Sequence, residues 1–121
     1  MAASLGHTQI VTKLLEKGAK LDVQGKNGKT ALMAACEHGH TKIAKHLILE
    51  GCNLNLEDKK GNTALIYAAQ TGSLAIVQSL IEKKAKLSSK SKDGHTAMFY
   101  AAQGGFREIE SALFKAGAKK Q

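Results

Sequence analysis

Residues 36–40 read Cys-Glu-His-Gly-His and bring one thiol and two imidazoles close together in the sequence. Zinc prefers such ligands, but it needs about four of them in tetrahedral geometry. Cys36 stands in an alanine-rich apolar pattern, and Cys52, the other cysteine, follows a glycine in a similar setting. A free cysteine in such a pattern is typical of a small buried apolar residue. We therefore expect no metal site and no cofactor.

Two loop segments carry residues that could support catalysis or phosphate binding. Asp93 and His95 lie close together, but a catalytic dyad also needs a nucleophile and an enclosed pocket, and the sequence indicates neither. Residues 25–30 end in Gly-Lys-Thr, which loosely resembles a phosphate-binding loop. That motif also needs a preceding strand and a glycine where Val23 stands. We therefore predict a protein that is not an enzyme.

The length of 121 residues suits one domain. Hydrophobic residues make up 43% and charged residues 23%, as in soluble folded proteins. No apolar run is long enough for a transmembrane helix, and the N-terminus lacks the basic and apolar regions of a signal peptide. Two cysteines do not form a disulfide framework, so we expect a cytoplasmic or nuclear protein.

The net charge of +8 comes almost wholly from lysine, because Arg107 is the only arginine. A lysine is a hydrated point charge, whereas arginine contacts phosphate and guanine through two parallel hydrogen bonds. The charge therefore favours an acidic partner or general solubility over specific recognition of nucleic acid.

The main pattern of the chain is a repeat of 33 residues. Residues 63–72 read Thr-Ala-Leu-Ile-Tyr-Ala-Ala-Gln-Thr-Gly, and similar stretches occupy residues 30–39 and 96–105. A fixed period of this length is typical of stacked supersecondary units. In residues 1–25 only the later part of the repeat is present, beginning with Ala2 and Ala3.

Each repeat predicts two helices joined by a glycine turn. Thr30, Thr63 and Thr96 are candidate N-caps, whose hydroxyl groups can accept a backbone hydrogen bond in the first helical turn. Apolar residues then recur at the spacing of one helical face, and a second apolar stripe follows the glycine turn. We predict an all-α solenoid of helix–turn–helix units with a partial repeat at 1–25 and full repeats at 26–57, 58–90 and 91–121.

The repeats resemble those of the ankyrin family over essentially the whole chain. The resemblance rests on Gly-x-Thr-x-Leu-x-x-Ala-Ala-x-x-Gly early in the repeat and Ile-Val-x-x-Leu-Leu-x-x-Gly-Ala later, which residues 10–19 match almost fully. It implies stacked helix pairs with loops that project to one side. Family members mostly bind proteins through the loop tips and the first helices, which line a concave face.

Two departures from the family pattern carry structural expectations. Lys84 occupies the position of Gly18, Gly51 and Gly117 at the end of the second helix. If the backbone is left-handed there, a side chain with a Cβ atom is strained. Glu110 stands where Val77 stands one repeat earlier, which predicts a polar end face on the last repeat.

Equivalent positions should form columns across the repeats, and three such columns carry the predicted binding site. One contains the two tyrosines, a second lies one helical turn further on, and a third lies at the loop tips. Tyrosine is enriched at interface hot spots, and the lysines would attract acidic groups. The predicted partner-binding residues are Tyr67, Tyr100, Gln70, Gln103, Glu37, Lys26, Lys29, Lys59, Lys60, Lys92 and His95.

We predict a monomeric, non-catalytic module that binds a protein or peptide carrying acidic and apolar residues. The alternative is an array that docks on nucleic acid or an anionic membrane through its lysine-bearing loop tips. The two differ in salt response, because binding to phosphate weakens steeply with salt. A third possibility is a spacer within a longer array that binds nothing alone.

Overall fold

The computed structural model describes residues 24–25 and 27–117, and these contain six α-helices. No strand occurs within this part of the chain, so the predicted all-α fold is confirmed. The predicted partial repeat at 1–25 lies almost entirely outside the described residues. The helices are α2 (Ala31–Glu37), α3 (Thr41–Leu49), α4 (Ala64–Thr71), α5 (Leu74–Glu82), α6 (Ala97–Gln103) and α7 (Arg107–Lys115).

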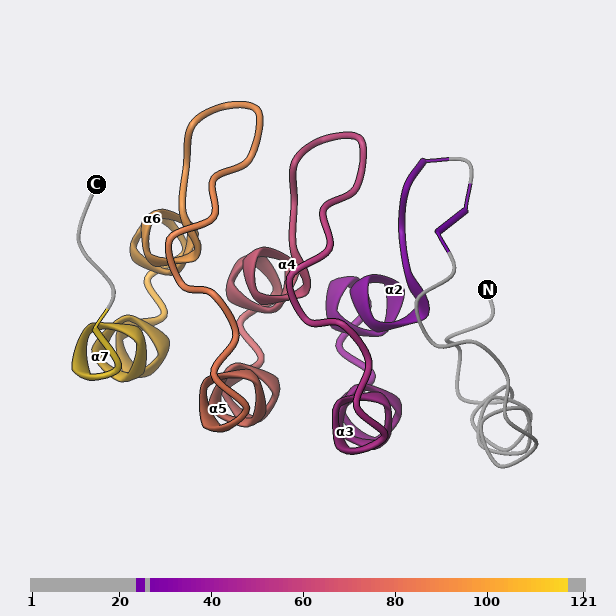
Figure 1. The fold of residues 1–121 in the computed structure, drawn as a ribbon. Coiled ribbons are helices and arrows are strands. Elements are labelled where there is room, and N and C mark those ends of the chain that lie inside the picture. Colours follow the sequence, from indigo (N-terminus) through magenta and orange to yellow (C-terminus); the bar gives the residue numbers. More distant parts are fainter. Residues whose placement is uncertain (1–23, 26, 118–121) are drawn as a thin grey trace.

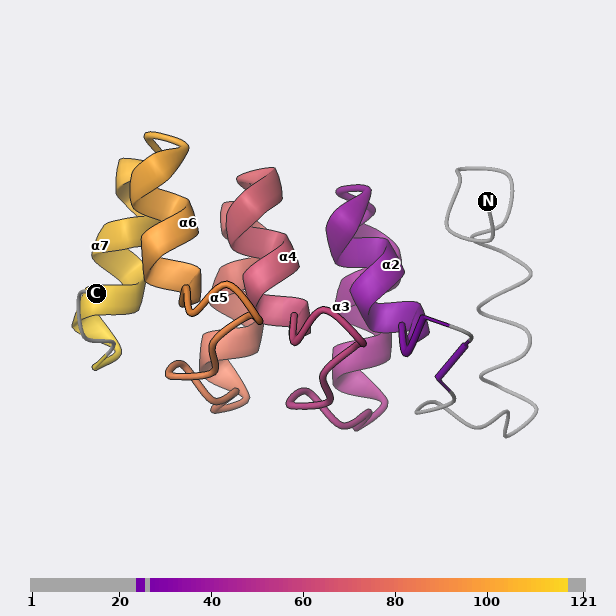
Figure 2. The same cartoon turned by 90° about the horizontal axis from the view of Figure 1, so that it is seen from above.

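The helices form two rows. Figure 1 shows α2, α4 and α6 in one row, α3, α5 and α7 in the other, and long loops that project beyond the first row. Within each row a helix packs against the next, and each helix of the first row packs against its successor in the second. Seen from above, α2, α4 and α6 run side by side in similar directions (Figure 2). None of the described helices has the length and apolar character needed to cross a membrane.

In each of the three described pairs, a threonine is the N-cap of the first helix, as predicted. The hydroxyl oxygens of Thr30, Thr63 and Thr96 accept hydrogen bonds from backbone N–H groups three residues later, over 3.2, 3.3 and 3.3 Å. These bonds satisfy donors that have no partner within the helix. The turn after α4 contains Gly72 with a φ of 83°, the left-handed conformation expected at a helix end.

The core lies between successive helix pairs and consists largely of alanine and other aliphatic side chains. Ala35, Ala68 and Ala101 are fully buried in the first row, and Ile43, Ile76 and Ile109 are buried in the second. Alanine allows neighbouring helices to approach closely. Helices of seven to nine residues are too short to be stable alone in water, so each pair depends on its neighbours for cover.

The projecting loops also contact one another through their backbones. The Lys59 N–H donates to the Asn27 carbonyl over 2.9 Å, and the Lys92 N–H donates to the Lys60 carbonyl over 2.9 Å. A Cβ atom placed on Gly61 would lie 2.9 Å from the Lys92 nitrogen. Gly61 therefore serves both a left-handed turn, with a φ of 75°, and the close approach of the next loop.

The third repeat ends its second helix with a strained lysine. Lys84 has a φ of 61°, the one positive φ among the described residues other than glycine. Gly51 and Gly117 adopt φ values of 87° and 110° at the equivalent positions. The left-handed backbone that the sequence pattern suggested for Lys84 is therefore confirmed.

The loop contact can be tested with a matched pair of alanine substitutions. Gly61→Ala and Gly94→Ala both place a side chain at a positive φ, but a Cβ atom on Gly94 meets no atom within 4 Å. We expect Gly61→Ala to lower the free energy of unfolding by about 1 kcal/mol or more beyond Gly94→Ala, because only Gly61 faces a neighbouring backbone. Urea unfolding of the two variants measures the difference. Equal losses would mean that the close approach of the loops contributes nothing.

Relief of the strain at Lys84 should stabilise the protein. Lys84→Gly removes a left-handed strain of about 1 kcal/mol, which we expect to exceed glycine's extra entropy cost in folding. We expect a higher melting temperature in a thermal unfolding scan. Lys83→Gly is the control, because the Lys83 φ of −91° needs no glycine, so this change should lower the melting temperature. The prediction fails if Lys84→Gly destabilises the protein as much as the control does.

Candidate functional site

A hollow of about 540 Å³ opens beside the loops and the first row of helices. The three first-row helices and two of the projecting loops contribute to its lining, so it exists only in the stacked array. The lining residues are Glu37, Lys60, Asn62, Tyr67, Gln70, Ser91, Lys92, Asp93 and Tyr100. Two lysines and two carboxylates are among them, and two phenol groups supply apolar surface together with a polar end.

Tyr67 lies in the wall of this hollow and is held by the preceding loop. Only 4% of its surface is exposed, and its hydroxyl group donates a hydrogen bond to the buried carboxylate of Asp58. The same carboxylate accepts from the backbone N–H groups of Lys60 and Asn62, each over 2.9 Å. Asp58 thus ties the loop to α4 and fixes the position of the phenol ring.

The environment of Tyr67 disfavours the phenolate. Burial, and then the hydrogen bond to Asp58, raise the pKa of Tyr67 to about 12, while the amide of Asn62 acts in the opposite direction. A phenol that donates to a carboxylate must lose that hydrogen bond when it ionises. Tyr67 therefore stays neutral at physiological pH.

Lys29 lies over the ring of Tyr67 and is paired with Glu37. The Lys29 ammonium group lies 2.5 Å from a Glu37 carboxylate oxygen and 5.2 Å from the centre of the Tyr67 ring. An ammonium group at this distance over an aromatic face is attracted by the ring. In the free protein, the Lys29 ammonium group is thus already partnered by the Glu37 carboxylate and the Tyr67 ring. Tyr67 in particular positions its neighbours more than it offers open surface.

Tyr100 is more accessible and stands within an aromatic cluster. It is half-buried, and its hydroxyl group lies 2.9 Å from the Ser91 hydroxyl oxygen. His95 stacks on Phe99 with ring centres 3.7 Å apart, and Tyr100 meets both rings edge-on at 5.9 and 5.5 Å. These ring contacts pack His95 of the last loop against α6 beside the hollow.

The structure brings most of the predicted binding residues together. Six of them line the hollow, Lys29 pairs with Glu37, and His95 contacts Tyr100. Gln103 and Lys59 are exposed but do not line it, and Lys26 lies outside the described residues.

Sequence reasoning missed Asn62, Ser91 and Asp93 as lining residues. The repeat itself carried a signal for two of them. Ser91 is equivalent to Asp58, and Asn62 is equivalent to His95, so the column of loop residues could have been extended. The equivalence does not predict that Asp58 is buried, since Gly25 stands at the same position one repeat earlier.

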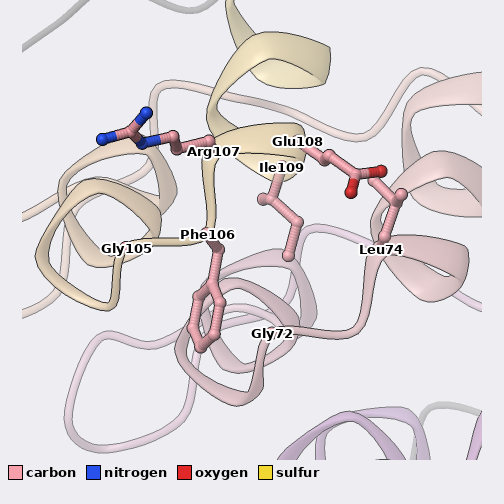
Figure 3. Close-up of a pocket in the computed structure, with 7 residues that line it drawn as sticks. All are labelled: Gly72, Leu74, Gly105, Phe106, Arg107, Glu108 and Ile109. Atoms are coloured by element: carbon pink, nitrogen blue, oxygen red, sulfur yellow. The ribbon is translucent and has the colours of Figure 1, made fainter.

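A second hollow of about 340 Å³ lies at the turns between the helices of the last two pairs. In Figure 3 the Phe106 ring points toward Gly72, and Glu108 is directed toward Leu74 while Arg107 is directed away from it. A Cβ atom on Gly72 would lie 2.6 Å from the Phe106 ring. Phe106 therefore fills a place that only glycine leaves free.

The described cysteines and histidines form no group suited to a metal ion. Cys36 and Cys52 are both buried, and burial, together with the nearby Cys52 thiol, raises the pKa of Cys36 far above its usual range. His38 and His40 have ring centres 6.1 Å apart. Within residues 24–25 and 27–117, no three His, Cys, Asp or Glu side chains are grouped closely enough to hold a metal ion.

The raised pKa of Tyr67 predicts a loss of stability at high pH. A phenol normally ionises near pH 10, so the unfolded chain ionises there while the folded protein does so near pH 12. The stabilisation is complete below about pH 10 and is lost as the pH rises to about 12. We expect Tyr67→Phe to be less stable at pH 8, by about 1–3 kcal/mol, and to lose less of its stability over this range.

Urea unfolding at several pH values measures both curves. The two proteins share the same lysines, so the difference between their curves isolates the phenol. Parallel curves between pH 10 and 12 would contradict the assignment.

Comparison with known proteins agrees with this geometry. The family model described as ankyrin repeats (3 copies) matches residues 1–91 and 42–121. The probable E3 ubiquitin-protein ligase XBOS33 of Oryza sativa subsp. japonica is 60% identical over 37 residues, which are 31% of this chain and 7% of that protein. The match thus spans only a small part of that curated relative. Ankyrin repeats are generally protein–protein interaction modules, and this chain belongs to the ankyrin repeat family.

Proposed function

We propose that this chain is a non-catalytic recognition module that holds a partner protein or peptide against the hollow between its loops and first helices. The observation that carries the proposal is the convergence of residues from three repeats on one hollow of about 540 Å³. Ankyrin arrays generally bind proteins, and the hollow lies beside the aromatic cluster and the stacked loops. Cytoplasm or nucleus remains our proposed location.

The lining suggests the chemistry of the partner. Lys60 and Lys92 are exposed and joined by a backbone hydrogen bond between adjacent loops, and both line the hollow. Such a pair suits an acidic side chain. Tyr100 offers a half-buried ring to an apolar side chain, and Gln70 offers an exposed amide. We infer an extended or helical segment that carries one or two apolar residues next to acidic ones.

The alternative of docking on nucleic acid or an anionic membrane has less support. Lys29 is already paired with Glu37, and Glu37 and Asp93 bring negative charge into the same lining as the lysines. Phosphate groups would meet these carboxylates. A protein segment can match both signs of charge, which favours a protein partner.

Affinity capture from cell lysate with a set of matched variants tests the proposal. The hollow variant is Lys60→Ala with Lys92→Ala and Tyr100→Ala. The control is Lys45→Ala with Gln78→Ala, two exposed positions on α3 and α5 in the other row. We expect proteins that the native chain retains to be lost with the hollow variant and kept with the control.

Binding measurements on a captured partner then separate the contributions. We expect Tyr100→Ala alone to weaken affinity by about 2 kcal/mol, roughly thirtyfold, if its ring is a binding anchor. The lysine changes should act mainly on the association rate and its salt dependence. Tyr67→Ala is unsuitable, because it would leave a cavity and would remove the hydroxyl donor from the buried Asp58 carboxylate.

Two outcomes would refute the proposal. The hollow is the wrong surface if the control variant loses the partner and the hollow variant keeps it. The recognition of phosphate would be indicated if single-stranded RNA or phosphatidylserine vesicles bind the native chain, and if that binding falls steeply between 50 and 200 mM salt, as counterion release requires.

A further inference from the structure

Helix α7 carries a stripe of four residues, three of which are exposed. Arg107, Glu110, Ser111 and Phe114 follow one helical face and line a hollow of about 250 Å³. Arg107 is directed away from Leu74 of the preceding pair (Figure 3). Ser111 and Phe114 are exposed as well, and Glu110 is half-buried. We call these four residues the α7 stripe.

Within the array, the side chains equivalent to Glu110 and Phe114 are buried or half-buried, whereas Lys45 and Gln78, the equivalents of Ser111, are exposed. Ile48 of α3 is 4% exposed and Ile81 of α5 is half-buried, but Phe114 at the same position is 62% exposed. In the first row, Ala69 is fully buried, while its equivalent Ala102 is exposed. The apolar column that holds the repeats together thus continues onto the outer side of the last described pair.

Glu110 suggested a polar end face from the sequence, and the exposed Phe114 ring adds an apolar surface to it. The stripe combines one large apolar ring with one cation, one carboxylate and one hydroxyl group. Such a surface is complementary to a partner that presents an aromatic ring opposite the cation and a hydroxyl group opposite the carboxylate. A second α7 stripe that runs in the opposite direction presents these groups.

In place of the monomer expected from the sequence, we propose that the α7 stripe binds the α7 stripe of a second copy of this chain, with the two helices antiparallel about a two-fold axis. If the axis passes between Glu110 and Ser111, Arg107 lies opposite the second copy's Phe114, and Glu110 lies opposite the second copy's Ser111. All four residues then have a partner, and each contact occurs twice, as a two-fold interface requires.

The paired groups are chemically complementary. A guanidinium group is attracted to the face of an aromatic ring, and a carboxylate accepts a hydrogen bond from a hydroxyl group. Arg107 also lies about 6 Å along the helix axis from the second copy's Glu110, at 1.5 Å per residue, which is within reach of its long side chain. With one large apolar residue from each copy, the interface is small and the dimer is weak.

Leu49 provides a matched control for Phe114. These two are the exposed large hydrophobic residues in the described part of the chain, at 72% and 62% exposure. Leu49 ends α3, and its neighbours Lys45 and Glu50 are exposed charged residues. A charge at either position leaves the core intact, so a difference between the two variants reports on the surface alone.

Sedimentation velocity of the 121-residue chain over a concentration series tests the proposal. We expect the weight-average mass to rise from 12.8 kDa toward twice that value at high concentration. Phe114→Glu should weaken dimerisation by about tenfold or more, because a buried aromatic ring is lost. Leu49→Glu should leave it unchanged. A native chain that stays monomeric throughout, or equal losses in both variants, would overturn the proposal.

A charge exchange tests the register of the two helices. Arg107→Glu gives an all-acidic stripe and Glu110→Arg gives a stripe with two arginines, so each variant should dimerise less than the native chain. An equimolar mixture should associate again, because opposite stripes now face each other. If the mixture associates no more than the separate variants, this antiparallel pairing is wrong.

Discussion

The structure depends on mutual cover between successive helix pairs. Helices of seven to nine residues cannot persist alone, and each pair presents an apolar side that only its neighbour can shield. Ala35, Ala68 and Ala101 are fully buried because their small side chains let the first-row helices approach closely. A larger side chain in this column would push two pairs apart and expose both. Stability therefore belongs to the interfaces between repeats, as in other quasi-linear arrays.

The close approach of successive repeats also brings the residues of the candidate site together. Backbone hydrogen bonds join adjacent loops, and Gly61 permits the close approach that brings Lys60 and Lys92 together. Side chains of different repeats also connect directly: the Thr71 hydroxyl group donates to the Cys36 carbonyl over 3.0 Å, from one first-row helix to the next. Because these contacts hold successive repeats side by side, residues of three repeats line one hollow. The site and the fold thus have a common physical cause.

The period of the sequence was sufficient to predict the helices, their threonine caps and the left-handed backbone at Lys84, because all of these repeat with local chemistry. The aligned columns also indicated which residues would gather near the hollow. Their accessibility was not predictable. Tyr67 and Tyr100 occupy equivalent positions, yet Asp58 and Lys29 enclose the first, while Ser91 leaves the second half-open. Such differences arise from single loop residues that the repeat does not specify.

The two surfaces proposed here lie on different rows of the array. The hollow is formed by the loops and the first row, whereas the α7 stripe belongs to the second row (Figure 1). Their linings share no residue. Pairing through α7 would leave the hollow of each copy open, so a dimer would present two such hollows at once. A partner with two recognition segments would then bind more tightly through effective concentration than either contact alone allows. A weak self-association could in this way contribute to affinity without any added contact in the hollow.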